Sequence, residues 1–415
     1  MIEKILAKAS GRRSVSPGEV VIANVDTAIT HDLSGYSTSR AFSSDVGGTM
    51  RAADRAIMVF DHLFSPPTEE KARILRHNRD FCREHGIQLY GPGNGNVHHV
   101  AARHGHIRPG TIVAGNDSHS TVHGTMGCLS IALGGNSFAG SVWPYGRAWL
   151  RVPETIAIEL VGYPPPGTTP RDVALWLVAQ IGEGGAIYAG LRFEGEYVRQ
   201  LGFWDRWLFP LMAVDVGAKC GYIEPDAITE AASREFGVGS YEIFHSDPGE
   251  TIAQRWKFDV SHVPPVVACP PTIGNVRPIM DLVGTALDWC ELGGHGGGRV
   301  EDFVDALAGM ASRTRHTDLS LNLVPSSREV FADLLESGQA ATLHAQGGNW
   351  FPASDGSNQA INMGAMAPGE SMLSTQARNF PGRNGSTQSQ MFVASALSVG
   401  AAAVHGRIVD PRDVL

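Results

Sequence analysis

The segment TIVAGNDSHST, residues 111–121, joins a run of apolar and small residues directly to a polar cluster. Residues 111–115 predict a buried strand, because a short apolar run bounded by glycine is typical of one. Asp117, Ser118 and His119 follow that strand. Short apolar runs alternate with helical patterns along the rest of the chain. The sequence therefore predicts an α/β protein.

Two elements further along the chain extend this alternation. Residues 155–161 (TIAIELV) predict another strand. A helix is predicted to begin after Thr169, because Pro170 suits the first helical position and Asp172 the first turn. It is expected to end at Gly182, since glycine commonly follows the last helical residue.

Proline-rich seams divide the sequence into thirds. One seam covers residues 162–167 and the other covers 263–271. In the last third, a strand is predicted at 321–325 and a capped helix over 326–338. The seams place three predicted subdomains at 1–163, 164–262 and 263–415.

Composition excludes several classes of protein. The chain of 415 residues is 43% hydrophobic and 18% charged, with a net charge of −9. That charge argues against a general nucleic-acid or membrane-surface binder. Because no secretory signal and no run of about 18 apolar residues is present, we expect a cytoplasmic protein. The five cysteines form no CxxC pair and are expected to be buried, reduced thiols.

Two glycine-rich segments invite comparison with nucleotide-binding loops. Residues 93–96 (GNGN) and 293–298 (GGHGGG) match neither GxxxxGK[ST] nor GxGxxG. We expect both to be turns in which two backbones approach closely.

Histidines, in three cases with a nearby aspartate, occur in four short segments of the first third of the chain. These are His31-Asp32, Asp61-His62, His98-His99 and Asp117-Ser118-His119. An aspartate beside a histidine orients the ring and raises its basicity, which prepares it for general acid or base catalysis. Direct ligation of a metal by imidazole is the alternative, and the residues alone leave both open.

Two arginines lie far downstream, around a Pro-Gly turn. Arg378 and Arg383 are five residues apart in RNFPGR. The planar guanidinium binds a carboxylate bidentately and stays charged, so the pair is able to hold a carboxylate from one loop. A solvated turn is the alternative.

Several longer motifs follow one another along the chain. They are EKILAKASGR at 3–12, the HD pair at His31, GNVHHVAARHG at 95–105, GNDSHST at 115–121, VPETI at 152–156, APGE at 367–370, RNFPGR at 378–383 and the ending VASALSVGAAAVHGRIVD at 393–410. In these motifs the chain resembles the large subunits of the aconitase/isopropylmalate dehydratase family, over essentially its whole length.

The resemblance implies three α/β/α subdomains of the aconitase type with the active site between them. It implies that Asp61 and His62 form the acid pair that protonates the departing hydroxyl. It also implies roles for further residues, with catalytic positions at His98, Asp117, His119 and, by a looser match, Asp215, and substrate-binding positions at His31, Ser118, Arg378 and Arg383.

The residues that would hold an iron–sulfur cluster depart from the family pattern. The first cluster cysteine of the family falls at Ile273, and the next two fall at Asp355 and Asn358. A [4Fe–4S] cluster needs thiolates at these points, so we expect none to be bound. Either no metal is bound, or Asp355 and Asn358 hold one divalent ion such as Mg, Mn or Fe with a nearby histidine.

The resemblance implies a hydro-lyase that dehydrates and rehydrates a hydroxylated di- or tricarboxylate. The family's catalytic serine base lies on a swivelling domain that this chain lacks, so a separate small subunit is the expected partner. A catalytically inactive scaffold or binding protein is the alternative, because decay would also remove the cluster ligands. The retained acid, histidine and arginine positions favour the enzyme.

Overall fold

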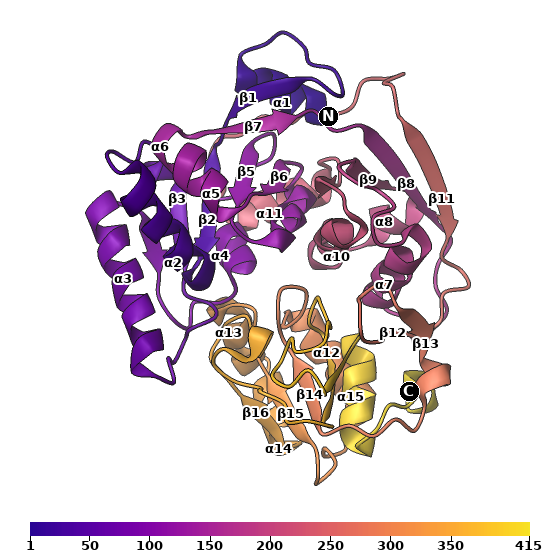
Figure 1. The fold of residues 1–415 in the computed structure, drawn as a ribbon. Helices are drawn as coiled ribbons and strands as arrows, with labels where there is room; N and C mark the ends of the chain where they lie inside the picture. The colour runs from indigo at the N-terminus through magenta and orange to yellow at the C-terminus, as the bar shows by residue number, and fades with distance from the viewer. The chain divides into compact units, whose positions relative to one another are not determined.

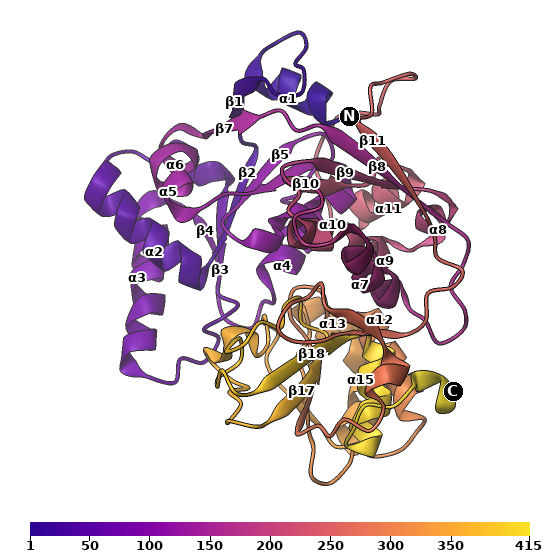
Figure 2. The same cartoon turned by 45° about the vertical axis from the view of Figure 1, so that its right-hand side comes forward.

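A computed structural model describes residues 1–415 of the chain. The chain forms two compact α/β units (Figures 1 and 2). Unit 1 comprises Met1–Gly91, Val97–Val161 and Gly184–Asp259, and unit 2 comprises Pro92–Asn96, Gly162–Glu183 and Val260–Leu415. The α/β class is confirmed, whereas the division into three subdomains at 163 and 262 stays a prediction. None of the helices combines the length and apolar character that a membrane crossing requires.

Unit 1 contains two parallel sheets and one antiparallel ribbon. The five-stranded sheet has the order β4-β3-β2-β5-β6, and the four-stranded sheet has the order β10-β9-β8-β11. The strands are β1 (Val20–Asn24) and β7 (Arg147–Arg151) in the ribbon, β2 (Thr27–His31), β3 (Ala56–Val59), β4 (Gln88–Tyr90), β5 (Ile112–Gly115) and β6 (Leu129–Ala132) in the larger sheet, and β8 (Thr155–Val161), β9 (Gly190–Glu194), β10 (Cys220–Tyr222) and β11 (Gln254–Asp259) in the smaller.

Helical segments of unit 1 connect these strands. The α-helices are α1 (Ile2–Ser10), α2 (Asp32–Ala41), α3 (Glu69–His85), α4 (Val97–Arg103), α5 (Gly135–Ser137), α6 (Trp143–Tyr145), α8 (Glu196–Gln200), α9 (Phe203–Arg206), α10 (Leu208–Met212) and α11 (Ala227–Glu235). The 3-10 and π segments are η1 (Phe42–Val46), η2 (Ala53–Arg55), η3 (Ser118–Met126), η4 (Phe138–Val142) and η5 (Ala213–Val216).

The strand order of the larger sheet explains where polar residues collect. The chain passes from β2 to β3 and β4 on one side, and then returns to β5 and β6 on the other. At such a reversal the connections after the two central strands diverge, and ligands bind at the carboxyl ends of the strands there. His31 is the last residue of β2, Asp61 follows β3, and Asp117 follows β5.

Unit 2 repeats this arrangement in a seven-stranded sheet of order β13-β12-β18-β17-β14-β15-β16. The five strands from β18 to β16 are parallel, and β12 runs antiparallel to β13 and β18. The chain passes from β14 to β15 and β16, and then returns to β17 on the other side of β14. Its elements are α7 (Pro170–Ile181), β12 (Val266–Ala268), β13 (Val276–Pro278), η6 (Ile279–Leu282), β14 (Trp289–Leu292), α12 (Val300–Met310), β15 (Ser320–Leu323), α13 (Arg328–Glu336), α14 (Gln339–Ala345), β16 (Gly348–Trp350), η7 (Asn358–Ala360), β17 (Ser371–Ser374), β18 (Gln390–Ala394), α15 (Ala396–His405) and η8 (Pro411–Asp413).

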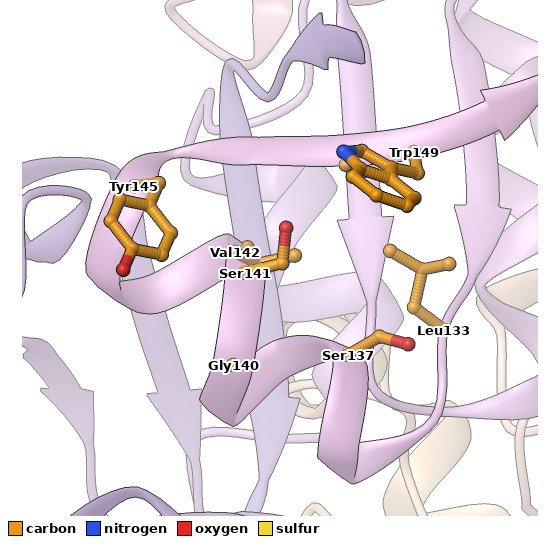
Figure 3. Close-up of a pocket in the computed structure, with 8 residues that line it drawn as sticks. Leu133, Ser137, Gly140, Ser141, Val142, Tyr145 and Trp149 are labelled. Atoms are coloured by element: carbon orange, nitrogen blue, oxygen red, sulfur yellow. The ribbon is translucent and has the colours of Figure 1, made fainter. Parts of the chain in front are cut away.

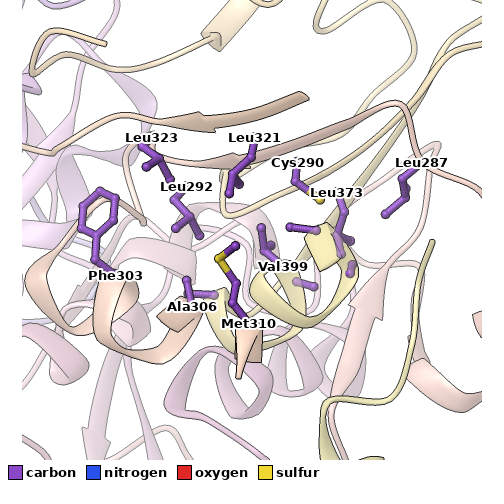
Figure 4. Close-up of a cluster of buried hydrophobic side chains, with 14 of the residues drawn as sticks. Leu287, Cys290, Leu292, Phe303, Ala306, Met310, Leu321, Leu323, Leu373 and Val399 are labelled. Atoms are coloured by element: carbon purple, nitrogen blue, oxygen red, sulfur yellow. The ribbon is translucent and has the colours of Figure 1, made fainter. Parts of the chain in front are cut away.

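The core of unit 2 lies between its sheet and the helices α12 and α15 (Figure 4). Leu292 and Leu373 of the sheet pack with Phe303 of α12 in this core. The two helices approach closely because glycine lies at their contact. A Cβ atom on Gly309 would lie 2.2 Å from the Leu397 carbonyl oxygen, and one on Gly400 would lie 2.2 Å from that of Ala306.

Several predicted elements are confirmed. The strand predicted at 155–161 is β8, and the one predicted at 111–115 is β5 with one residue fewer. Helix α7 begins after Thr169 and ends before Gly182. The Asp172 carboxylate accepts hydrogen bonds from the Thr169 amide at 2.8 Å and the Thr169 hydroxyl at 2.9 Å, which fixes this helix start.

Close backbone approach is confirmed at both glycine-rich segments. Gly298 has a φ of +73°, and a Cβ atom there would lie 2.3 Å from the Val324 carbonyl oxygen. Gly95 has a φ of +134°, and a Cβ atom there would lie 2.4 Å from the Ser326 carbonyl oxygen. The next amide, of Asn96, donates to that same oxygen at 2.8 Å. Gly95 therefore allows the short 92–96 segment to pair with the start of α13.

Replacing Gly95 by alanine is expected to destabilise unit 2 by about 2–3 kcal/mol, because the new methyl group meets backbone and the φ angle is strained. Thermal unfolding followed by circular dichroism measures the loss. Gly134→Ala is the matched control, since Gly134 has a φ of −67° and no atom lies within 4 Å of its Cβ position. Equal melting of the two variants would contradict the close approach.

Candidate functional site

The centre of the candidate site in unit 1 is the pair formed by Asp61 and His62. Both side chains are buried, in the loop that follows β3. The Asp61 Oδ1 atom lies 2.7 Å from the His62 Nδ1 atom, and Asp61 Oδ2 accepts a hydrogen bond from the Val97 amide at 2.8 Å. The carboxylate thus holds a proton on Nδ1, so Nε2 is the ring atom placed to exchange a proton with a substrate.

Asp32 positions this pair through the backbone. Its carboxylate accepts hydrogen bonds from the amides of Leu33 at 3.0 Å, His62 at 3.3 Å and Leu63 at 2.6 Å. The side chain is fully buried, and these bonds tie the start of α2 to the turn after β3. His31 stacks on the His62 ring, with centroids 4.3 Å apart and 22° between the planes. Asp32 is therefore a positioning residue.

A second set of groups surrounds Asp117. The His98 Nε2 atom lies 3.0 Å from Asp117 Oδ1, and the same oxygen accepts the His119 amide at 2.8 Å. The other His98 nitrogen lies 3.4 Å from the His123 Nε2 atom. His31 connects the two sets, since its Nε2 atom is 4.0 Å from Asp117 Oδ2.

His123 is a member of this set that the sequence analysis missed. Its ring is buried, and burial lowers the pKa of His123 well below its usual value, reinforced by the charge of His98 and opposed by that of Asp117. A neutral ring is a suitable partner for His98. No acid adjoins His123 in the sequence, so no Asp-His pair marks it, although it lies four residues after His119 in η3.

Asp215 and Ser118 join the set through His119. Asp215 Oδ2 lies 3.8 Å from His119 Nε2, and the Ser118 hydroxyl lies 3.4 Å from His119 Nδ1. By contrast, His99 faces another way, with its ring stacked on Trp204 at 4.8 Å between centroids. Seven of the predicted site residues belong to the first third of the chain, and all seven lie near one another in unit 1. Asp215 lies beside them.

Arg378 and Arg383 lie in unit 2, in the loop that follows β17. The Arg383 guanidinium lies 5.2 Å from the Phe380 ring centre, and its side chain is buried. The Asn379 amide donates to the Ala268 carbonyl oxygen at 3.1 Å, which anchors the loop to β12. Gly382 has a φ of +79° and makes the turn between the arginines.

A pocket of about 380 Å³ lies elsewhere in unit 1. Tyr145 and Trp149 flank Ser141 there (Figure 3). Its lining contains no carboxylate, histidine, lysine or arginine, and none of its residues belongs to the polar cluster. The chemistry points to the carboxyl ends of β2, β3 and β5 rather than to this pocket.

Comparison with known proteins connects this arrangement to a family. The chain matches the Aconitase family (aconitate hydratase) over residues 3–291 and 281–406. The chain belongs to the aconitase family. The 3-isopropylmalate dehydratase large subunit 1 of Methanopyrus kandleri is 35% identical over 419 residues, which cover 100% of this chain and 99% of that protein.

The chain is also similar to a second large subunit and to one solved structure. The probable methanogen homoaconitase large subunit of Methanothermobacter thermautotrophicus is 35% identical over 417 residues, covering 99% of this chain and 97% of that protein. Among solved structures, the holo-form of aconitase X from Thermococcus kodakaraensis matches with a TM-score of 0.49 and 11% identity, over 94% of this chain and 87% of that one.

Aconitase-family proteins usually carry a [4Fe–4S] cluster, and the residues of this chain do not fit one. The predicted positions hold Ile273, Asp355 and Asn358, and all three side chains are buried. The five cysteines are buried as predicted, and burial raises the pKa of each, for Cys82 and Cys220 to about 12. Thiols that resist deprotonation are poor cluster ligands.

Proposed function

We propose that the chain is the large subunit of a hydro-lyase that dehydrates and rehydrates a hydroxylated di- or tricarboxylate without a [4Fe–4S] cluster. The observation that carries the proposal is the buried Asp61–His62 pair at the carboxyl end of a parallel sheet. Its relatives support it, because they are named as large subunits of 3-isopropylmalate dehydratase and homoaconitase.

In the proposed reaction, the substrate carboxylates bind Arg378 and Arg383. His62 donates a proton from Nε2 to the departing hydroxyl, so the C–O bond breaks and water leaves. The proton on the neighbouring α-carbon passes to a base, and its electron pair forms the C=C bond. Asp61 stabilises the imidazolium that donates the proton, and a positioned acid of this kind accelerates such a step by about 10²–10⁴-fold.

The remaining cluster residues hold the substrate in this scheme. We assign Asp215 and His119 to the reacting hydroxyl, and His98, oriented by Asp117, to the same centre. His31 and Ser118 line the substrate position. Each of these side chains offers a donor or acceptor within 4.0 Å of another member of the cluster.

The base and further substrate contacts are assigned to a small-subunit partner with a swivel domain. The name "large subunit" borne by the relatives supports a two-subunit enzyme. We place the protein in the cytoplasm, since five reduced cysteines suit a reducing compartment. The cofactor in this proposal is either absent or one divalent ion, and the three-subdomain organisation of the family is retained.

Purified complex, co-expressed with its small subunit, is expected to contain no acid-labile sulfide and well under about 4 iron atoms per chain. It is also expected to hydrate or dehydrate at least one member of a panel that includes 3-isopropylmalate, homocitrate and citrate. Sulfide analysis separates a cluster from a single bound iron ion. Stoichiometric sulfide would refute the cluster-free proposal, and a fully inert complex across hydroxy di- and tricarboxylates would refute the hydro-lyase proposal.

A further inference from the structure

Four buried polar side chains meet at the carboxyl edge of the sheet in unit 2. Asn96 precedes α4, His295 follows β14, and Asp355 and Asn358 lie in the loop after β16. Their exposed fractions are 0%, 2%, 0% and 3%. Buried side chains of this polarity require mutual contacts, because their transfer from water is costly without them.

Three atoms of this group form a nearly equilateral triangle. The Asn96 Nδ2 atom lies 2.6 Å from Asp355 Oδ1 and 2.8 Å from His295 Nδ1. The remaining side, between His295 Nδ1 and Asp355 Oδ1, is also 2.8 Å. The corners of such a triangle are about 60°.

Hydrogen bonds alone do not satisfy all three sides. The two N–H bonds of an amide diverge by about 120°, so Asn96 cannot aim one at each neighbour across a 60° corner. If His295 donates from Nδ1 to Asp355, then the Asn96 and His295 nitrogens are two donors in contact. If Nδ1 is unprotonated, it is an acceptor facing the carboxylate oxygen. With Asp355 ionised, one side therefore brings like groups together whether or not His295 Nδ1 carries a proton.

A cation resolves the conflict. The oxygen and nitrogen of a side-chain amide exchange places on a half-turn, so Asn96 is able to present Oδ1 at the same point. The triangle then has three electron-pair donors. Neighbouring ligands of an octahedral ion bound at about 2.1 Å lie about 3.0 Å apart, close to the observed sides. Asn358 Nδ2 donates to Asp355 Oδ2, and a half-turn of its amide would present Oδ1 on the same side as a fourth oxygen ligand.

The surrounding residues fix the loop that carries two of these groups. Glu291 lies near the end of β14. Its carboxylate accepts hydrogen bonds from the Ser357 hydroxyl at 2.9 Å and from the Gln376 side-chain amide at 2.8 Å. Asn384 in turn donates to the Ser357 hydroxyl at 2.6 Å. Ser357 lies between Asp355 and Asn358 in the sequence, so this shell holds both in place. Such second-layer contacts are characteristic of metal sites.

We propose that Asn96, His295, Asp355 and Asn358 bind a single divalent cation of the Mn²⁺ or Fe²⁺ kind. One imidazole, one carboxylate and amide oxygens suit these ions. This inference rests on the proposed function, which leaves one divalent ion open as its cofactor. All four ligands belong to unit 2 and their occupancy is measured without substrate, so failure of the cation site is distinguishable from failure of the hydro-lyase.

Titration of the metal-stripped protein with Mn²⁺, followed by the loss of the free-ion electron paramagnetic resonance signal, tests the site. We expect one Mn²⁺ per chain. Asp355→Asn and His295→Ala are each expected to weaken binding by about 10-fold or more. Asp318→Asn, an exposed acid of the same unit, is the matched control and is expected to bind as the wild type does. No bound Mn²⁺, or equal binding by all variants, overturns the proposal.

Asn358→Asp provides a test that does not depend on losing a ligand. The substitution keeps the side-chain shape and places a second carboxylate against Asp355, which costs stability unless a cation lies between them. We expect this variant to melt lower than the wild type in chelator and to regain stability on addition of Mn²⁺. Melting that does not respond to Mn²⁺ in either protein overturns the proposal, whatever the enzyme's activity.

Discussion

Replacing His62 by alanine is expected to lower kcat by about 10²–10⁴-fold and to leave folding intact. The ring is held at 2.7 Å by Asp61, and its removal deletes the proposed proton donor to the departing hydroxyl. The measurement is the initial rate of dehydration by the co-expressed complex, with substrate chosen from the active members of the panel. A fall in kcat with little change in KM would locate the loss in the chemical step.

Two comparisons make the His62 result specific. His245→Ala removes an imidazole whose side chain is 58% exposed in the same unit, and it is expected to leave kcat unchanged. Circular dichroism of both variants checks the fold, because His62 stacks on His31 and its loss leaves a small cavity. Turnover by His62→Ala at the wild-type rate would remove His62 from the acid role.

Much of the unit 1 site follows from local sequence. Strands β3 and β5 are short runs of apolar and small residues, and β2 mixes alanine and isoleucine with threonine. His31, Asp61 and Asp117 come at or just after the ends of β2, β3 and β5. Parallel strands bring their carboxyl ends to one edge, so residues at these positions converge once the strand order is known. Asp172 and Gly182 likewise set the bounds of α7 through local hydrogen bonds and backbone preference.

Contacts between segments that are far apart in the chain could not be predicted from the sequence. Asn96 meets His295 across 199 residues and Asp355 across 259. His295 lies in a glycine-rich run whose composition predicts only a close turn, and His123 lies in a 3-10 segment without an adjacent acid. No local pattern marks either one. Their roles come from tertiary packing, which the spacing of residues along the chain does not encode.

Both of these parallel sheets reverse their strand order, and polar residues lie at each reversal. The two sets of polar residues differ in their chemistry. In unit 1 the strand order reverses between β2 and β5, where imidazoles and carboxylates collect. In unit 2 it reverses between β14 and β17, and the connections that follow carry His295 and Arg378. Each reversal leaves a place where polar side chains are supported by rigid strands. Acid–base groups and cation or carboxylate ligands therefore occupy equivalent places in the two units.

Replacing Asp61 by asparagine is expected to lower kcat by about 10²–10⁴-fold without removing the histidine. The new amide must accept the Val97 amide with its oxygen, so its NH₂ group faces His62 Nδ1. That arrangement forces the opposite tautomer and deprives the imidazolium of its counter-ion, an effect known to be large when a carboxylate orients a catalytic histidine. Initial rates and circular dichroism measure the loss, and Asp54→Asn, whose side chain is 78% exposed, is the control.

The double variant Asp61→Asn/His62→Ala tests whether Asp61 acts through His62. Suppose that the carboxylate only orients the His62 ring and stabilises its positive charge. Asp61→Asn then causes no further loss of rate once His62 is alanine. The double variant is then expected to lose no more than about threefold beyond His62→Ala alone, since residues that act as one unit are non-additive. Losses that multiply would instead mean that Asp61 contributes by a separate route, through Val97 and the start of α4.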